Sequence, residues 1–365
     1  MLAAADRSGR SVRFEGGGTK RAWGTAPRGG FDLALSTAVL DRVIEHNAAD
    51  LTAVLEAGVP LARAQAAFAG AGQMLALDPP DPGGATIGGV LATGDSGPLR
   101  HRYGGVRDQL LGIRVALADG TLARAGGKVI KNVAGYDLGK VFAGSYGSLG
   151  LMVEAVVRLH PAPVRRATVI GTSGDPGRVQ RAAIALARAP LELEGLDARW
   201  SRETGGVLVA RAAGVVPEKR LARISGLMKD AGLAAAEGDD EQEWDRQRRG
   251  QRAGPGETVV RISTVRSDLA RVIEAARDVG AEVVGRAGLG LFWMKLAPPD
   301  TGARTIATIR RALAPRPCVV LDAPEELRPE IDVWGPVEGM DLMRRLKERF
   351  DPNRTCNPGV FVGGL

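Results

Sequence analysis

Glycine recurs every few residues between Gly126 and Gly150, in the stretch GGKVIKNVAGYDLGKVFAGSYGSLG. Two runs precede it: GGG begins at Gly16 and GGATIGGVLATGDSGP begins at Gly83, so in chain order these are the first and second runs and Gly126–Gly150 is the third. Fifty residues of the chain are glycine, and the densest runs lie in its first half. Such runs favour tight turns and close approach of the backbone to a ligand, because no side chain shields the main-chain N–H groups. The spacing fits neither G-x-G-x-x-G nor a P-loop, so we expect neither a Rossmann fold nor a P-loop kinase.

The composition is that of a globular protein with two domains. Hydrophobic residues make up 44% and charged residues 25% of the 365 residues, so the chain can bury a sizeable core. The formal net charge is +7 and the sequence pI is about 9.8, which suits an anionic ligand or an acidic partner. Because the arginines are scattered among acids and no Lys/Arg block is interleaved with aromatic residues, we expect no nucleic-acid partner.

The cysteines and the N-terminus indicate the compartment. Only Cys318 and Cys356 occur, so this chain alone can build neither a disulfide framework nor an iron–sulfur cluster. We predict two reduced thiols and no metal site. The N-terminal MLAAADRSGRSVRF lacks an apolar signal region, and no run of about 18 apolar residues occurs. We therefore expect a cytoplasmic protein that reaches a membrane only through a partner.

Local patterns predict an α+β fold. In the first half, helical spacing indicates helices over 37–46 and 60–72, and alternation indicates a strand over 149–161. Asp119-Gly120, between two strand-like runs, predicts a hairpin with a type I′ turn. After about residue 162, amphipathic helices alternate with short apolar runs, which indicates a second α+β domain. Within it, the polar stretch 237–257 is expected to form a helix and an exposed loop.

Several motifs together resemble a known family. LDPP, GGATIGGVLATGDSGP, RYGGVRD, the stretch Gly126–Gly150 and FDPNRTCNPGVF occur in this order along the chain. They resemble the PCMH-type FAD-binding domain of the vanillyl-alcohol-oxidase superfamily and, within it, the E-subunit family of bacterial glycolate oxidases. The resemblance is dense over residues 11–162 and 331–361 and thin between them. It implies an FAD-binding domain of two subdomains at 1–162, a smaller α+β cap with an antiparallel sheet at 163–330, and a segment at 331–365 that returns to the first domain.

The resemblance also implies which residues hold FAD. Members with covalently attached flavin use a histidine in the first glycine loop, and none lies between Glu15 and Gly24, so FAD is expected to bind non-covalently. Lys131 and Asn132 are expected to be functional. The implied cofactor-binding residues are Gly16, Gly17, Gly18, Thr19, Pro80, Gly84, Thr86, Gly88, Gly89, Thr93, Gly94, Ser96, Gly144, Ser145, Gly147, Leu149, Gly150, Val153 and Asn357.

The second domain carries fewer candidates. Related hydroxy-acid dehydrogenases place histidines and acids there, whereas the comparable strand of this chain reads VVGRAGLGLFWMK and has no histidine. Arg286 and Lys295 remain as candidates to bind a substrate carboxylate, and no catalytic residue is assigned. His101, in RHRYG, is expected at the surface. General-base catalysis needs a group that takes a proton near neutral pH, so we expect this chain to assist a larger complex.

Three functional hypotheses remain. The leading one is an FAD-binding subunit of a glycolate oxidase-like complex, with a homologous flavoprotein subunit and an iron–sulfur subunit as partners. That complex would oxidise glycolate, or another small 2-hydroxy acid, to the 2-oxo acid. The second is a freestanding FAD-dependent 2-hydroxy-acid dehydrogenase of the D-lactate type. The third is a non-catalytic scaffold subunit with a vestigial flavin pocket.

Overall fold

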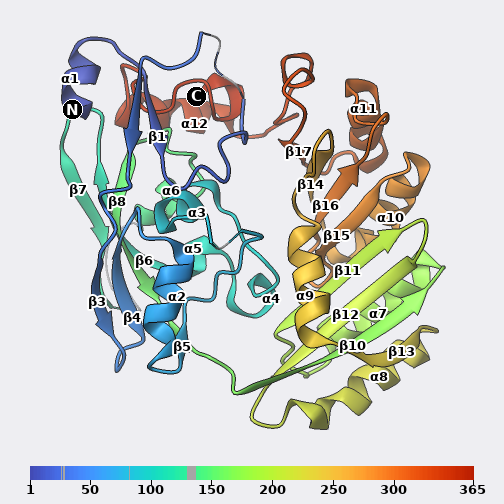
Figure 1. Ribbon diagram of the computed structural model, residues 1–365. Helices are drawn as coiled ribbons and strands as arrows, with labels where there is room; N and C mark the ends of the chain where they lie inside the picture. The colour runs from blue at the N-terminus through green and yellow to red at the C-terminus, as the bar shows by residue number, and fades with distance from the viewer. Residues whose placement is uncertain (26, 28, 82, 130–136) are drawn as a thin grey trace. The chain divides into compact units, whose positions relative to one another are not determined.

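The protein is described from a computed structural model, which places residues 1–25, 27, 29–81, 83–129 and 137–365 (Figure 1). The chain divides into two compact units. Their segments are Met1–Ser96, Tyr103–Ala162 and Val337–Leu365 for unit 1, and Gly97–Arg102 and Pro163–Pro336 for unit 2. Both units combine helices with antiparallel sheet, which confirms the expected α+β class.

Unit 1 is built on a five-stranded antiparallel sheet in the order β3-β4-β8-β6-β7. Its strands are β3 (Val43–Asn47), β4 (Thr52–Glu56), β6 (Leu110–Ala116), β7 (Leu122–Gly126) and β8 (Leu151–Arg158). Two strand pairs lie outside it: β1 (Val12–Glu15) with β2 (Leu33–Ser36), parallel, and β5 (Gln73–Met74) with β9 (His160–Pro161), antiparallel. The helices are α1 (Leu2–Arg7), α2 (Leu61–Ala69), α3 (Ile87–Thr93), α5 (Val106–Gln109), α6 (Gly139–Phe142) and α12 (Met340–Phe350), and α4 (Arg100–Tyr103) joins the two units.

Helices α2 and α3 contribute to the core of unit 1. Leu61 and Phe68 of α2 recur at helical spacing and are fully buried, as are Ile87 and Leu91 of α3 and Leu55 of β4. Removing each of these side chains from water contributes ~1.5–3 kcal/mol. The glycine-rich run that begins at Gly83 therefore contains a helix that is fixed by its own apolar face.

Two local predictions for unit 1 were wrong. The 3.6-residue spacing at 37–46 does not form a helix: β3 pairs with β4 across an irregular register, and Val39 remains 86% exposed. Strand pairing outweighs the local pattern here, because β3 completes the edge of the sheet. A type I′ turn needs a positive φ at both central residues. Gly120 has a φ of 91°, but the φ of Asp119 is not positive, so the turn after β6 is of another type. Instead Leu117 donates to the carbonyl of Thr121 at 2.9 Å, and the Asp119 carboxylate accepts from the Thr121 amide at 2.8 Å.

Unit 2 is built on an eight-stranded antiparallel sheet in the order β13-β10-β12-β11-β15-β16-β14-β17. Its strands are β10 (Arg165–Ser173), β11 (Gly195–Ser201), β12 (Gly205–Gly214), β13 (Ala234–Gly238), β14 (Thr258–Ser263), β15 (Glu282–Arg286), β16 (Leu291–Leu296) and β17 (Cys318–Asp322). Its helices are α7 (Pro176–Arg188), α8 (Leu221–Asp230), α9 (Asp240–Arg249), α10 (Leu269–Asp278) and α11 (Ala303–Leu313).

The two faces of this sheet are covered differently. A Cβ at Gly171 would meet α8, at 2.8 Å from Met228 Sδ, whereas a Cβ at Gly195 would lie 2.6 Å from the ring of Trp244 in α9. Thr168 bonds to the same Trp244 ring and is three residues from Gly171 on β10, so the two residues face opposite sides of the strand. Helix α9 therefore covers the face opposite to α8, as Figure 1 also shows.

Among the residues that the structure places, no helix is long and apolar enough to cross a membrane.

Candidate functional site

The first two glycine runs touch in unit 1. A Cβ at position 17 would lie 1.7 Å from the carbonyl oxygen of Gly84, and one at position 16 would lie 2.4 Å from Thr86 Oγ1. These separations are shorter than any van der Waals contact, so a side chain at Gly17 would push the two segments apart. The runs are therefore glycine-rich because the two backbones pack directly on each other.

This contact leaves main-chain donors available. Within the described part of the chain, the amides of Gly16, Gly17 and Gly18 donate to no acceptor, and all three residues are exposed. Thr86, beside Gly16, caps the start of α3 by accepting from the Gly89 amide at 3.3 Å. Several free N–H groups in one turn form a concavity suited to phosphate oxygens.

The third glycine run lies beside the C-terminal end of α3. Gly144 donates to the carbonyl of Leu91 at 2.9 Å, and Tyr146 donates to the carbonyl of Ala92 at 2.8 Å. Gly94 ends α3 in the left-handed conformation, with a φ of 69°. A Cβ there would lie 3.7 Å from Gly144 Cα, so the second and third runs are neighbours as well.

The C-terminal segment joins the same cluster through Asn357. Its Oδ1 accepts from the Phe14 amide at 2.8 Å, and its Nδ2 donates to the Tyr146 carbonyl at 2.7 Å. A Cβ at Gly147, whose φ is 71°, would lie 2.7 Å from Asn357 Nδ2. One buried amide thus links β1, the third glycine run and the C-terminal segment.

An ion pair that we did not predict spans the first two runs. Lys20 Nζ lies 3.1 Å from Asp95 Oδ2, and the two side chains are only 7% and 5% exposed. Lys20 also donates to Thr19 Oγ1 at 3.1 Å, and Asp95 Oδ1 accepts from the Ser96 amide at 2.9 Å. The spacing of Lys20 and Asp95 in sequence gave no signal for this pair.

The remaining cofactor candidates of unit 1 are bonded within the chain. Thr93 Oγ1 donates to the carbonyl of Gly89 at 2.8 Å, Ser145 Oγ donates to that of Phe142 at 2.8 Å, and the Val153 carbonyl accepts from Ala57 at 3.0 Å. Lys131 and Asn132 lie outside the described residues. Pro80, Gly88, Leu149 and Gly150 also belong to unit 1.

The structure does not bring the two substrate candidates of unit 2 together. Arg286 is fully buried and its Nη1 donates to Asp197 Oδ2 at 2.6 Å. Lys295 pairs with Glu282 at 3.3 Å and with Glu257 at 3.6 Å. Arg286 is opposite Leu291 on the neighbouring strand, four residues before Lys295, and at ~3.3 Å per residue this is about 13 Å. A two- or three-carbon acid cannot reach both.

His101 differs from the expectation of a surface residue. It belongs to unit 2, where its ring packs on Gly288: a Cβ there would lie 2.4 Å from His101 Cε1. Burial, and then the charges of Arg266 and Arg286, lower the pKa of His101 to about 4. Unit 2 therefore does contain a neutral imidazole, which we missed because His101 precedes the rest of that unit by some sixty residues in sequence.

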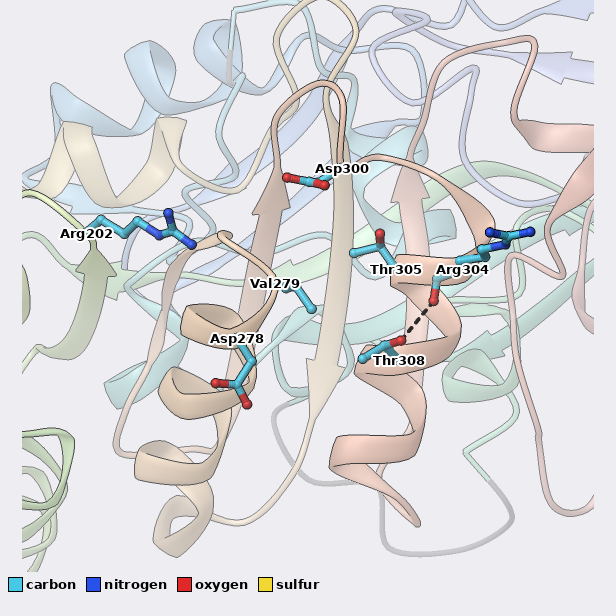
Figure 2. Close-up of a pocket in the computed structure, with 7 residues that line it drawn as sticks. All are labelled: Arg202, Asp278, Val279, Asp300, Arg304, Thr305 and Thr308. Carbon is cyan, nitrogen blue, oxygen red and sulfur yellow. Dashed lines mark hydrogen bonds between the residues drawn. The ribbon is translucent and has the colours of Figure 1, made fainter.

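A cavity of about 330 Å³ lies elsewhere in unit 2, at the start of α11 (Figure 2). Its walls hold charges of both signs, including Arg202, Arg304 and Asp300, and contain none of the predicted site residues. The dashed line in Figure 2 is the bond from Thr308 to the carbonyl of Arg304 within the helix. Within the described ranges, no group of three or more His, Cys, Asp and Glu residues could hold a metal ion.

Comparison with known proteins finds an FAD-binding family over the part of the chain that holds the first two glycine runs. Residues 1–126 match the family described as FAD binding domain. The chain is 38% identical over 179 residues to the glycolate oxidase subunit GlcE of Escherichia coli (strain K12), covering 47% of this chain and 50% of GlcE. It is 27% identical over 386 residues to the glycolate oxidase subunit GlcD of Bacillus subtilis (strain 168), covering 94% of this chain and 82% of GlcD.

Other similarities agree with these. A D-lactate dehydrogenase of Archaeoglobus fulgidus is 35% identical over 163 residues, covering 44% of this chain and 36% of that protein. The chain thus spans half or less of GlcE and of this dehydrogenase. In structure it is similar to an alkyldihydroxyacetonephosphate synthase, with a TM-score of 0.71 and 16% identity over 98% of this chain and 74% of that one, which shows a shared fold.

The family match and the relatives confirm the expected cofactor, FAD, and the expected class, an FAD-dependent oxidoreductase. The cluster fits this cofactor, because free amides at Gly16, Gly17 and Gly18 suit a pyrophosphate.

Proposed function

We propose that this chain is the FAD-binding, E-type subunit of a glycolate oxidase-like complex that oxidises glycolate, or another small 2-hydroxy acid, to the 2-oxo acid. The observation that carries the proposal is the meeting of three glycine runs and Asn357 in a chain similar to both GlcE and GlcD. The partners would be a homologous flavoprotein subunit and an iron–sulfur subunit. The proposed domains are an FAD-binding domain at 1–162, a cap at 163–330 and a returning segment at 331–365.

The residues of unit 1 would act by binding. The amides of Gly16, Gly17 and Gly18 would hold the pyrophosphate, and the backbone of Gly144–Gly150 would follow the rest of the dinucleotide. FAD, when bound, supplies the two-electron acceptor for the carbon that bears the hydroxyl group. Asn357 fixes the C-terminal segment against these loops, so it positions the site without having to touch the flavin.

A second function is supported by His101. We had expected catalysis on a partner because VVGRAGLGLFWMK lacks a histidine, but unit 2 places the His101 ring on Gly288 of this very stretch. A neutral imidazole can hydrogen-bond to a substrate hydroxyl, although a pKa of about 4 makes it a weak base near neutral pH. A freestanding 2-hydroxy-acid dehydrogenase of the D-lactate type is therefore the alternative function.

One experiment separates the hypotheses. The purified chain is examined by visible spectroscopy and then mixed anaerobically with glycolate or D-lactate, alone and with its partner subunits. A flavin spectrum that bleaches only with the partners supports the E-type subunit, and bleaching of the lone chain supports the freestanding dehydrogenase. If the chain is purified in quantity and never binds FAD, both proposals fail and the scaffold hypothesis holds.

A further inference from the structure

Arg286 has two buried donors without an acceptor among the described residues. The residue ends β15 and has no exposed surface. Its Nη1 bonds to Asp197 Oδ2 at 2.6 Å, whereas its Nε and Nη2 meet no hydrogen-bond partner among the residues placed by the structure. Buried guanidinium donors are almost always satisfied in folded proteins. An acceptor beyond the described residues is therefore expected at this edge.

The free edge has the shape of a carboxylate receptor. Nε–H and one Nη–H of a guanidinium can point the same way, and this fork matches the two oxygens of a carboxylate. Asp197 holds another corner of the group, and the Arg286 Cζ lies 4.9 Å from the centre of the Trp293 ring. Because two neighbours already fix the plane of the guanidinium, little rotational freedom remains to be lost when an anion binds.

The charges nearby also favour an anion. His101 has Arg266 and Arg286 as the charged neighbours that lower its pKa, and Asp197 is the acid paired with Arg286. Two arginines thus act on the imidazole, and Asp197 pairs with one of them. His101 Nδ1 is itself buried and meets no partner in the described chain, so a third polar atom of the cluster is available to a ligand.

We propose that Arg286 and His101 form a binding site for a small 2-hydroxy or 2-oxo acid, in which the free edge of Arg286 takes the carboxylate and His101 Nδ1 bonds to the oxygen on C2. The identity of the acid rests on the proposed function, whereas the anion site rests on the cluster itself. Asp197 is a positioning residue, which holds the guanidinium. Lys295 takes no part, because its charge is engaged by Glu257 and Glu282.

The test measures binding without turnover. The FAD-loaded full chain is titrated with oxalate, which carries a carboxylate next to a C2 oxygen, by calorimetry and by NMR of the His101 ring. We expect Arg286→Met to weaken binding at least tenfold. A carboxylate also offsets the two arginines, so oxalate should raise the pKa of His101 above about 4. The chain has only two other histidines, His46 and His160, and His101→Gln identifies the signal.

Controls separate the site from folding. Arg286→Met breaks the buried ion pair between Arg286 and Asp197, so the double variant Arg286→Met/Asp197→Leu is measured as well. The matched control is Arg211→Met: Arg211 is also buried, lies 2.9 Å from Glu194 and stacks 4.4 Å from the Trp244 ring. Arg211→Met should keep the wild-type affinity for oxalate, and all variants are compared by FAD content and melting temperature.

The outcomes are distinct. Unchanged affinity in both Arg286 variants, or a His101 signal that ignores oxalate, overturns the site. Equal binding of chloride or inorganic phosphate overturns the assignment to a 2-hydroxy or 2-oxo acid. If glycolate bleaches the flavin equally well in Arg286→Met, the further site fails while the proposed function stands. If oxalate binds at His101 but neither glycolate nor D-lactate reduces the flavin even with partner subunits, the proposed function fails while the site stands.

Discussion

Lys347 of α12 is expected to be the most sensitive single charge in unit 1. Its side chain is buried, and its three donors are all used: Nζ donates to the Ser148 carbonyl at 2.7 Å, to Asp351 Oδ2 at 2.6 Å and to the Cys356 carbonyl at 3.0 Å. Lys347 thus ties α12 both to the third glycine run and to the C-terminal segment. Replacement by methionine keeps much of the volume and removes all three bonds.

The cost follows from what remains. Asp351 has no exposed surface, and after the change it keeps only the amides of Thr355 at 2.9 Å and Cys356 at 2.8 Å. Removing one partner of a buried ion pair typically costs ~3–5 kcal/mol. For a unit of this size each kilocalorie lowers the melting temperature by about 2–4 °C, so Lys347→Met should lower it by roughly 6–20 °C.

The assay follows thermal unfolding of unit 1 by the fluorescence of released FAD, because two units can unfold in separate transitions. Arg344→Met is the matched control on the same helix: its pair with Asp341 is exposed at both partners and should cost at most ~0.5 kcal/mol. The double variant Lys347→Met/Asp351→Asn should recover part of the loss, since no charge is then left buried alone. A loss below about 1 kcal/mol in Lys347→Met, or a double variant no better than the single one, would refute this reasoning.

Three further predictions concern flavin, pH and thiols. Gly17→Glu should purify without FAD, because its Cβ would lie 1.7 Å from the Gly84 carbonyl oxygen and its negative charge would repel the phosphates. Gly226→Glu is the control and should keep FAD, because no atom lies within 4 Å of its Cβ position. Equal absorbance at 450 nm per chain in the two variants would contradict this prediction. The pKa of His101 is lowered to about 4 in the folded protein, so on acidification the unfolded chain protonates this imidazole first. The free energy of unfolding should therefore be unaffected by His101 above pH ~6.5 and should fall between pH ~6.5 and about 4. Denaturant titrations of His101→Gln should lack this fall. Burial raises the pKa of Cys318 to about 11 and also raises that of Cys356, so a thiol reagent at pH 8 should label neither until the protein unfolds.

The parts of the site that the sequence could reveal are those made by backbone. A side chain is excluded at Gly17 and Gly147 by atoms distant in sequence, the Gly84 carbonyl and the Asn357 amide. Glycine at such positions leaves a trace in the sequence even when the partner is unknown, because any other residue would clash. The motif around Asn357 pointed to the same cluster through the resemblance alone.

The sequence could not predict the parts of the structure that depend on contacts between side chains far apart in the chain. The helix expected within 237–257 forms as α9, and residues 254–256 of the loop that follows are exposed. The sequence did not show that α9 buries Glu243 and Gln247, which it does because the sheet face below it carries charged partners such as Arg199, which bonds to Glu243. Hydropathy predicts that charged side chains are exposed to water. This prediction is wrong where a sheet carries charged residues on the face that contacts a helix.

His101 is the clearest case, because its position bears on the alternative function. Its neighbours in sequence are two arginines, which indicate solvent, and the residue that its ring packs on, Gly288, lies far along the chain. That glycine would be read in isolation as part of a hairpin turn. The absence of a histidine from VVGRAGLGLFWMK therefore suggested that no imidazole lies near this stretch, although Gly288 within it contacts the ring of His101. A search for catalytic groups in a two-unit chain must include the segments that cross from one unit to the other, because a residue there can complete a site whose own strands lack it.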